Sequence, residues 1–484
     1  MWLNPELKKI GFALAATLAL TQCAQSPVSG GKDVLPMSGK QEIQQSAQAH
    51  EEVLAEYGVV DNPGLQAYVA RVGKAIATNS HRPDLDWQFT VLDSPEVNAF
   101  ALPGGYVYIT RGILAYLDSE AELAGVLSHE IGHITARHAL HQQSASATTG
   151  LAAILDAILL PGMNNEAGAT MLHSLATSWT NGYGRNNELE ADRLGAEYLA
   201  KTRYDPQALV EVIGILKNQE LFDAEQAKRE GREPNHYHGT FATLPDNDIR
   251  LKQVVGEAVK YKGASPRQNK DEFLRVMNGV YFGDSPAQGV FRNNALLHSR
   301  LGLALQFPLD WKVQSEMDGA DAINFQQDAM MRLLPGPNYD KPQDALQRGL
   351  KLDAGARYES GSVNGHPAEF AAGAHQGKPV LAAAISYNGN QYLVAGITKD
   401  GPSYQRNKEA IKNAINSFRA MTPSERQQAH PFVIRIITAQ HGMTMTGLAA
   451  HSPLGPRAES YLRLMNHLYP GGEPSPGQLL KVVN

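Results

Sequence analysis

The chain is almost without cysteine: among its 484 residues only Cys23 is one. It therefore cannot form an internal disulfide, which is no obstacle even in an oxidising compartment. The chain has no long apolar run near its beginning, because residues 10–20 are too few for a membrane span of about 20 residues. It also lacks basic blocks and arrays of aromatic and basic residues, and this argues against a nucleic-acid partner.

The remaining composition is that of a globular protein. It is 43% hydrophobic with a net charge of −6 and a sequence pI of about 6.2. A chain of this length can form two or three domains with cores of their own. Residues 291–418 show no 34-residue helical repeat, which excludes a tetratricopeptide array there.

An H-E-x-x-H motif covers residues 129–133. Residues four positions apart lie on one face of a helix, so His129 and His133 can present two imidazoles to one metal ion. Glu130 lies beside them, in position to act on a metal-bound water. This combination is typical of a zinc protease.

The motif is predicted to lie inside a helix. Ser119 and Glu122 form an S-x-x-E capping box immediately before an apolar run, a pattern typical of a helix N-terminus. It predicts a helix from about Glu120 to His141. The two histidines would then lie on a rigid element, as a metal site requires.

A third ligand is needed, because catalytic zinc takes three protein ligands and leaves a fourth position for water. Residues 183–195 are predicted to begin a second helix that continues to about Ala200. Glu188 and Asp192 share a face of it, whereas Glu190 points elsewhere. We assign Glu188 as the ligand and Asp192 as the carboxylate that orients a ligand histidine. The alternative is a solvated acidic helix N-terminus, which the helix dipole favours.

H-E-I-G-H followed by E-x-E-A-D resembles the zinc metalloproteases that include the CAAX prenyl endopeptidases and the HtpX heat-shock proteases (peptidase family M48). The likeness is to the periplasmic BepA-like branch and covers residues 41–262. Residues 98–112 are similar to the strand-turn-strand element that precedes the metal helix in that family. The resemblance implies that Val107–Thr110 is the edge strand that lines the substrate cleft.

The resemblance also implies residue roles. One Zn²⁺ per chain would be held by His129, His133 and Glu188. Glu130 would be the general base, and Asp192 would match an assisting carboxylate.

One departure concerns a later T-H-P-x-x-x-x-R motif. Its histidine, which is thought to cap the zinc in the BepA-like branch, is replaced here by Leu244. This implies that the capping switch is missing at that position. Arg250 is retained, and we predict that it lies near the cleft as a catalytic residue.

The first residues resemble a secretion signal. Two lysines precede the apolar run 10–20, which has the length of a signal-peptide core. Cys23 then resembles a lipoprotein acylation site, although the preceding Gln22 is not small. Ala24 is not the aspartate that retains lipoproteins in the inner membrane, so an anchor at Cys23 favours the outer membrane. The alternative is a plain cleaved signal.

The rest of the chain carries other patterns. The apolar stretch 151–160 is predicted to be part of a soluble helical hairpin. An Asn-Gly pair at 388–389 predicts a β-hairpin, and residues 407–418 predict a helix. Residues 430–484 have a βααβ pattern that resembles a diverged LysM domain, which implies peptidoglycan as a partner; a plain packing or docking domain is the alternative.

We therefore predict an α+β chain. A signal segment (1–23) is followed by a mainly helical zincin-type metalloprotease domain with a small β-sheet (40–262). An α+β accessory domain (290–420) and a small LysM-like module (430–484) complete the chain.

The predicted function is that of a zinc-dependent endopeptidase of the bacterial cell envelope that cleaves misfolded or stalled proteins in the periplasm. Unfolded or misassembled envelope proteins would be its substrates. The alternative is a non-proteolytic chaperone or assembly factor for outer-membrane proteins that binds clients or peptidoglycan through its C-terminal modules. The intact H-E-x-x-H motif favours the enzyme.

Overall fold

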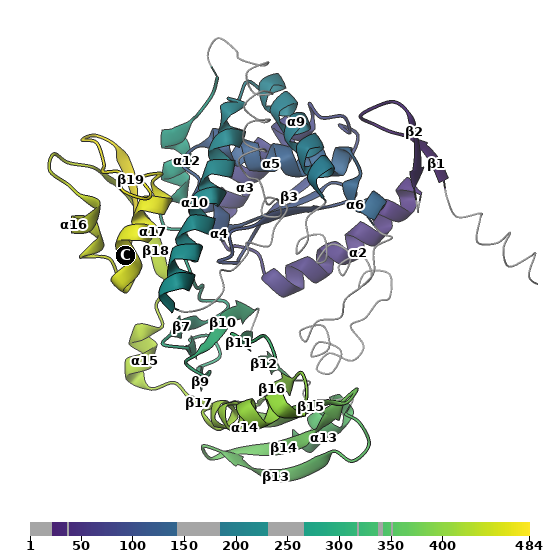
Figure 1. Ribbon diagram of the computed structural model, residues 1–484, viewed down its shortest axis with the longest axis vertical. Coiled ribbons are helices and arrows are strands. Elements are labelled where there is room, and N and C mark those ends of the chain that lie inside the picture. Colours follow the sequence, from purple (N-terminus) through teal and green to yellow (C-terminus); the bar gives the residue numbers. More distant parts are fainter. Residues whose placement is uncertain are drawn as a thin grey trace, which may run out of the picture.

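The structure is a computed structural model that describes residues 22–35, 38–142, 184–230, 266–316, 319–336, 342–349 and 352–484 (Figure 1). Within these ranges the fold is α+β, as the sequence predicts. None of the helices described there is both long and apolar enough to span a bilayer. Several features of the sequence lie outside the described residues, namely 1–21, 151–160, Leu244 and Arg250.

A three-stranded sheet lies at the centre of the N-terminal half. β3 (Gln88–Leu92) pairs in parallel with β5 (Tyr106–Thr110), and β4 (Ala99–Leu102) pairs with the other side of β5 in the antiparallel sense. The prediction that Val107–Thr110 is the edge strand was therefore wrong. β5 is the middle strand and is buried along its whole length, because it has a neighbour on each side and side chains packed on both faces. β3 and β4 are the two outer strands of this sheet as described.

Helices surround this sheet. Their bounds are α2 (Gly39–Tyr57), α3 (Pro63–Ala77), α5 (Glu120–Thr135), α9 (Arg185–Lys201) and α10 (Gln207–Glu230). The predicted second helix is confirmed as α9. α10 begins directly after Pro206 and continues to Glu230. Two shorter helices, α4 (Arg111–Leu114) and α12 (Lys270–Met277), complete this half.

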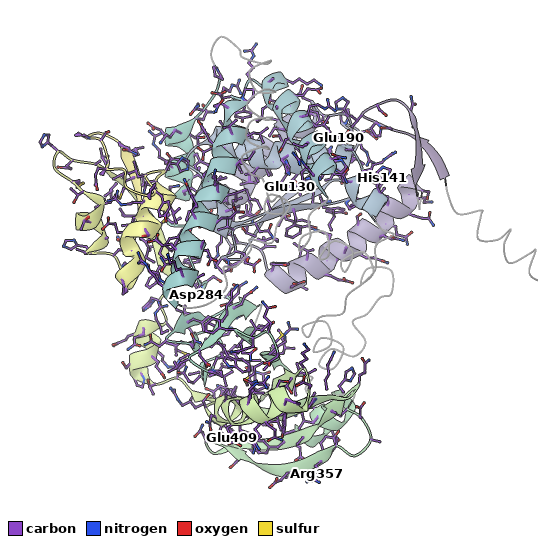
Figure 2. The ribbon with its side chains drawn as sticks, in the orientation of Figure 1. Glu130, His141, Glu190, Asp284, Arg357 and Glu409 are labelled. Atoms are coloured by element: carbon purple, nitrogen blue, oxygen red, sulfur yellow. The ribbon has the colours of Figure 1, made fainter. Side chains whose placement is uncertain are left out.

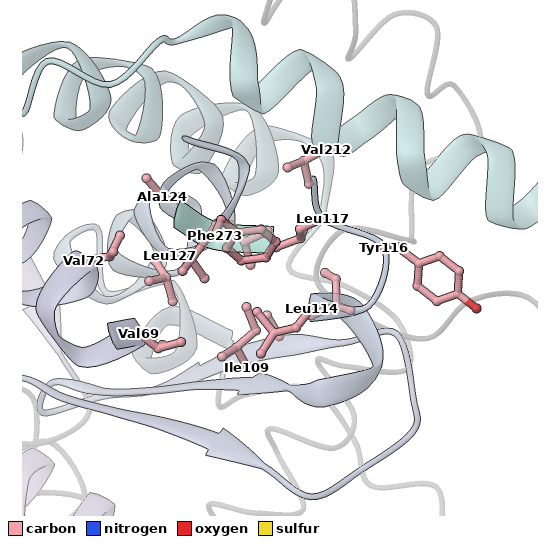
Figure 3. Close-up of a cluster of buried hydrophobic side chains, with 14 of the residues drawn as sticks. Val69, Val72, Ile109, Leu114, Tyr116, Leu117, Ala124, Leu127, Val212 and Phe273 are labelled. Atoms are coloured by element: carbon pink, nitrogen blue, oxygen red, sulfur yellow. The ribbon is translucent and has the colours of Figure 1, made fainter. Parts of the chain in front are cut away.

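The core forms where α3, α5, α10 and α12 meet β5 (Figure 3). Figure 3 shows the apolar side chains that converge there, among them Val69, Val72, Ile109, Ala124, Leu127, Val212 and Phe273. All 16 residues of α5 are buried. Since a buried polar group is costly unless it has a partner, the histidines and carboxylates in the middle of α5 must be engaged with other groups.

The metal helix is shorter than predicted. Its N-terminus is capped as expected, since Ser119 accepts a hydrogen bond from the Glu122 backbone N–H at 3.1 Å. The helix ends at Thr135, whereas His141 was predicted. Arg137 adopts a left-handed conformation with φ of 58°, which interrupts the helical hydrogen bonds, and α6 (His138–Gln142) then starts in a new direction. Neither glycine nor proline marks this break in the sequence.

A large antiparallel sheet occupies residues 311–398. Its strands, in the order β10-β11-β12-β16-β15-β14-β13, are β10 (Trp311–Glu316), β11 (Gly319–Asn324), β12 (Ala329–Pro335), β16 (Asn390–Thr398), β15 (Lys378–Tyr387), β14 (His366–His375) and β13 (Arg357–Val363). The Asn-Gly hairpin is confirmed: Asn388 and Gly389 have positive φ and join β15 to β16. The sheet is apolar on both faces, and each face carries a helix.

The two helices on this sheet are α14 (Gly401–Asn416) and α13 (Pro342–Gly349). α14 confirms the predicted helix, and its Ile411 and Ile415 are buried in the core of the sheet. It begins six residues earlier than the predicted start at 407, because Asp400 forms a capping box with Ser403. A second sheet, in the order β17-β9-β8-β7, consists of β17 (Arg419–Ala420), β9 (Leu303–Gln306), β8 (Ala295–His298) and β7 (Val290–Arg292).

The C-terminal segment has the predicted βααβ order. Its elements are β18 (Phe432–Thr438), α16 (Met445–Ala449), α17 (Ala458–Met465) and β19 (Leu479–Val483), and α15 (Pro423–Gln428) precedes them. β18 also pairs with β6 (Tyr281–Phe282). The buried apolar side chains of this segment belong to the same cluster as those of α3, α5 and β5. The segment therefore shares its core with the N-terminal half.

A buried lysine ties the C-terminal segment to the start of α5. Lys481 of β19 has no exposed surface, and its ammonium donates to the Leu117 carbonyl at 2.5 Å. Asp118 lies 3.9 Å away and also pairs with Lys270. Burial lowers the pKa of Lys481 to about 8, although the nearby carboxylates oppose this shift.

Two further groups complete this cluster. Glu122 accepts from the Asp118 backbone N–H at 2.6 Å, and burial raises the pKa of Glu122 to about 8. His467 donates to the Tyr116 carbonyl at 2.9 Å. All of these contacts fall on residues 116–122, so the C-terminal segment holds the N-terminus of α5 in place.

Two short strands, β1 (Gln22–Gln25) and β2 (Lys32–Leu35), pair as a hairpin ahead of α2. Cys23 lies in β1. The position of Cys23 in a strand does not test the hypothesis that this residue is acylated, which stays a prediction.

Candidate metal centre

The centre forms where α5 and α9 pack closely. A Cβ added to Gly132 of α5 would lie 2.9 Å from the Ala191 carbonyl oxygen of α9. A Cβ added to Gly195 of α9 would lie 3.1 Å from Ser128 Oγ. Two glycines at the contact therefore permit an approach that larger residues would prevent. This approach brings the start of α9 to the middle of α5.

Three ligand-type side chains converge at this contact. The Nε2 atoms of His129 and His133 are 2.9 Å apart. Glu188 Oε2 lies 3.4 Å from His129 Nε2 and 3.8 Å from His133 Nε2. Glu188 and His129 have no exposed surface, and His133 is 3% exposed. Within the described part of the chain, these three form the one group of histidine and acidic side chains that could hold a metal ion.

The distances fit a tetrahedral zinc site. Two ligand atoms, each about 2.0–2.2 Å from zinc, are about 3.3–3.6 Å apart at a tetrahedral angle. The three distances between 2.9 and 3.8 Å bracket this range. Two imidazole nitrogens and one carboxylate oxygen are a known donor set of catalytic zinc. The residues present therefore fit the ion.

The first of the two histidines is held by Asp192. His129 Nδ1 lies 2.9 Å from Asp192 Oδ1. Because a carboxylate only accepts, His129 Nδ1 carries the proton and Nε2 presents its lone pair to the cluster. The structure thus places Asp192 where the sequence analysis expected a carboxylate that orients a ligand.

The second histidine has a partner that the sequence analysis missed. His133 Nδ1 lies 2.9 Å from Nδ1 of His138, and His138 Nε2 lies 3.3 Å from Glu190 Oε2. This hydrogen bond lowers the pKa of Glu190. Glu190 does point away from the three-residue cluster, as predicted, yet it contacts the cluster through His138. No sequence pattern indicated this contact, because His138 is five positions after His133 and a continuous helix would separate them.

Glu130 is buried within the same region. It has no exposed surface, and Figure 2 shows it on α5 close to α9. With Glu188 and Asp192 it makes three buried carboxyl groups on two adjacent helices. Buried negative charges are costly unless a cation neutralises them, so this arrangement favours a bound metal ion.

A small cavity lies beside His133. It is lined by Ala101 and Pro103 at the end of β4 and by Ile134 and Leu140. The cavity places the outer strand β4 next to the metal-binding cluster. The remaining predicted site residue, Arg250, lies outside the described residues.

The comparisons with known proteins agree with this geometry. Residues 63–258 match the sequence profile of Peptidase family M48. The "Beta-barrel assembly-enhancing protease" of Escherichia coli (strain K12) is 28% identical over 285 residues, which cover 56% of this chain and 56% of that protein. The "Mitochondrial metalloendopeptidase OMA1" of Schizosaccharomyces pombe is 31% identical over 215 residues, 42% of this chain and 62% of that one. The chain thus spans little more than half the length of these relatives.

A buried helix with an H-E-x-x-H motif, joined by a glutamate from a second helix, is an arrangement typical of metallopeptidases. Residues 63–258 are similar to peptidase family M48, and the likeness extends to the beta-barrel assembly-enhancing proteases. A likeness of residues 430–484 to LysM domains finds no support in these comparisons.

Proposed function

We propose that the protein is a zinc-dependent endopeptidase of the bacterial cell envelope that cleaves misfolded or stalled envelope proteins. The observation that carries this proposal is the convergence of His129, His133 and Glu188 within a buried core. Relatives named for proteolysis and for β-barrel assembly support the substrate class. We assign the three converging residues as the ligands of one Zn²⁺.

The residues of the site have complementary roles. A zinc ion supplies Lewis-acid activation of a water and of the peptide carbonyl. Glu130 accepts the proton of the attacking water and delivers it to the leaving amine. Asp192 keeps His129 in the tautomer whose Nε2 lone pair faces the cluster. We retain Arg250 as a proposed catalytic residue that acts on a substrate carbonyl or a site carboxylate.

The neighbouring strand suggests how a substrate binds. β4 ends beside the cavity next to His133. An extended peptide that lies along this strand would have its backbone close to Glu130 and the ligands. Such binding depends on main-chain contacts, which suits a protease that acts on unfolded chains of many sequences.

Metal removal tests the proposal. We expect the purified protein to contain zinc, to cleave casein and to lose this activity when a chelator removes the metal. A stoichiometric addition of Zn²⁺ should restore it, while Mg²⁺ should not, because Mg²⁺ prefers oxygen ligands in octahedral geometry. Cleavage that survives complete removal of the metal would contradict the zinc assignment.

The proposal extends to location and partners. We propose that the N-terminal segment directs the protein to the periplasm, that Cys23 carries a lipid anchor to the outer membrane, and that residues 430–484 bind peptidoglycan. Intact-mass analysis of the mature protein checks the anchor: an unmodified N-terminus downstream of Cys23 rules it out. Retention of the full-length protein on purified peptidoglycan checks glycan binding, and its absence leaves the C-terminal segment with a structural role only.

A further inference from the structure

The surroundings of the two ligand histidines are alike in one respect and different in another. Each ring has its Nε2 in the cluster and its Nδ1 bonded to a partner outside it. For His129 the partner is a carboxylate, Asp192. For His133 it is a second imidazole, that of His138, and a carboxylate follows one step further out.

The donors and acceptors in this series of hydrogen bonds determine which nitrogens of His138 and His133 carry a hydrogen. Glu190 can only accept, so Nε2 of a neutral His138 carries a hydrogen and donates it to Glu190 Oε2. Nδ1 of His138 is then an acceptor, and the short contact requires that His133 Nδ1 donates to it. His133 is thereby held in the tautomer that presents the Nε2 lone pair to the cluster. The chain of hydrogen bonds achieves for His133 what Asp192 achieves for His129.

The backbone is bent to make this contact. Residues five apart on a continuous helix point about 140° away from each other, so His138 could not reach His133 if α5 continued. The left-handed residue Arg137, with φ of 58°, turns the chain and brings the two Nδ1 atoms to 2.9 Å. A non-glycine residue in this region is strained, and such strain is often found at functional sites. His138 is only 2% exposed, so the contact is enclosed by protein.

α9 supplies the carboxylate of the ligand set and both carboxylates that orient the histidines. Glu188, Glu190 and Asp192 alternate along its first two turns and reach the cluster, His138 and His129 respectively. A shift of α9 along its axis would therefore disturb one ligand and both orienting bonds together.

We propose that His138 and Glu190 are positioning residues of the metal centre, which hold His133 in the orientation and tautomer required to bind the metal. This inference rests on the proposed zinc site and deepens it. His138 itself contacts neither the substrate nor the metal, since its Nδ1 faces His133 and its Nε2 faces Glu190.

Zinc affinity of the full-length protein, measured by competition with a chromogenic chelator, tests this proposal. Loss of an outer partner of a metal-ligating histidine typically weakens metal binding by about 10–100-fold, and we expect His138→Ala to fall in this range. The visible absorption spectrum of the Co²⁺-substituted protein should change as well, because the position of one ligand changes. Glu190→Ala should give a smaller loss in the same direction.

A conservative variant separates positioning from packing. In His138→Asn the side-chain oxygen can accept from His133 Nδ1, so we expect most of the zinc affinity to return. Glu197→Ala, which removes another acidic residue of α9 that pairs with Lys201 at 2.8 Å, is the matched control and should leave the affinity unchanged. If His138→Ala does not fold, His138→Asn and Glu190→Ala still give the comparison with the control.

Two results would overturn the inference. One is a zinc affinity of His138→Ala within twofold of the wild type, and the other is an equal loss in His138→Ala and His138→Asn. Both leave the proposed function intact, because the wild type still binds zinc. A wild-type protein that binds no zinc would overturn the metal centre itself and this inference with it.

Discussion

Replacement of Glu130 by Gln is expected to abolish peptide cleavage while zinc stays bound. Glu130 follows His129 on α5 and is fully buried, but it does not belong to the group whose ligand atoms converge. A glutamine has nearly the same shape and cannot accept a proton from the attacking water. Loss of a general base typically lowers a rate by about 10²–10⁴-fold, so casein digestion should fall below detection in ordinary assays.

Zinc content is the necessary companion measurement. Glu130→Gln should contain as much zinc as the wild type, and Glu197→Gln, on the other side of α9, should keep both zinc and activity. Undiminished proteolysis in Glu130→Gln would mean that another group is the base. Loss of zinc in that variant would instead make Glu130 a ligand.

Replacement of Lys481 by Ala is expected to destabilise the protein strongly, although Lys481 lies 352 positions after His129 in the sequence. The ammonium of Lys481 donates to the Leu117 carbonyl and faces Asp118, and the side chain has no exposed surface. Removal of one partner from a buried charge cluster costs about 3–5 kcal/mol. For a domain of this size, such a loss lowers the melting temperature by on the order of 10 °C.

Two further variants show the origin of this effect. Lys481→Met keeps the apolar stem and removes only the charge, so we expect a smaller fall in melting temperature. Lys74→Ala removes an exposed lysine of α3 and should change the free energy of unfolding by less than about 0.5 kcal/mol. A melting temperature of Lys481→Ala equal to that of Lys74→Ala would show that the C-terminal segment does not hold the start of α5.

The Lys481 result also bears on the nature of the C-terminal segment. An independent binding module would unfold separately and leave the metal centre unaffected. In the structure, β18 pairs with β6, and the apolar side chains of α17 and β19 belong to the core that contains α5. We therefore expect loss of zinc binding and loss of the C-terminal fold to occur together on heating.

Sequence patterns formed by residues close together along the chain predicted the local structure well. The i, i+4 spacing on α5 and on α9 predicted which side chains share a face, and the Asn-Gly pair predicted the hairpin of β15 and β16. The Ser119 cap predicted the start of α5 to the residue. In each case the determining interactions lie within a few positions along the chain, so a single sequence contains the necessary information.

Structural features that depend on residues far apart in the sequence were predicted less well. β5 looks like any apolar strand, and only its pairing with both β3 and β4 makes it the middle strand. No glycine or proline marks the end of α5 at Thr135. Arg137 keeps its left-handed backbone conformation because the surrounding structure holds it there. Similarly, nothing near Lys481 in the sequence indicates that its partner is the carbonyl of Leu117.

The sequence by itself predicted the pair of histidines of the candidate metal site, because imidazoles four positions apart lie on one face of a helix wherever that helix lies. Only the tertiary structure decided that His138 contacts His133, that Glu190 contacts His138, and that Lys481 lies below the first turn of α5. Glu190 comes from α9, which meets α5 through close packing that glycines at 132 and 195 permit. Side chains that meet in this way are close in space although no sequence pattern links them.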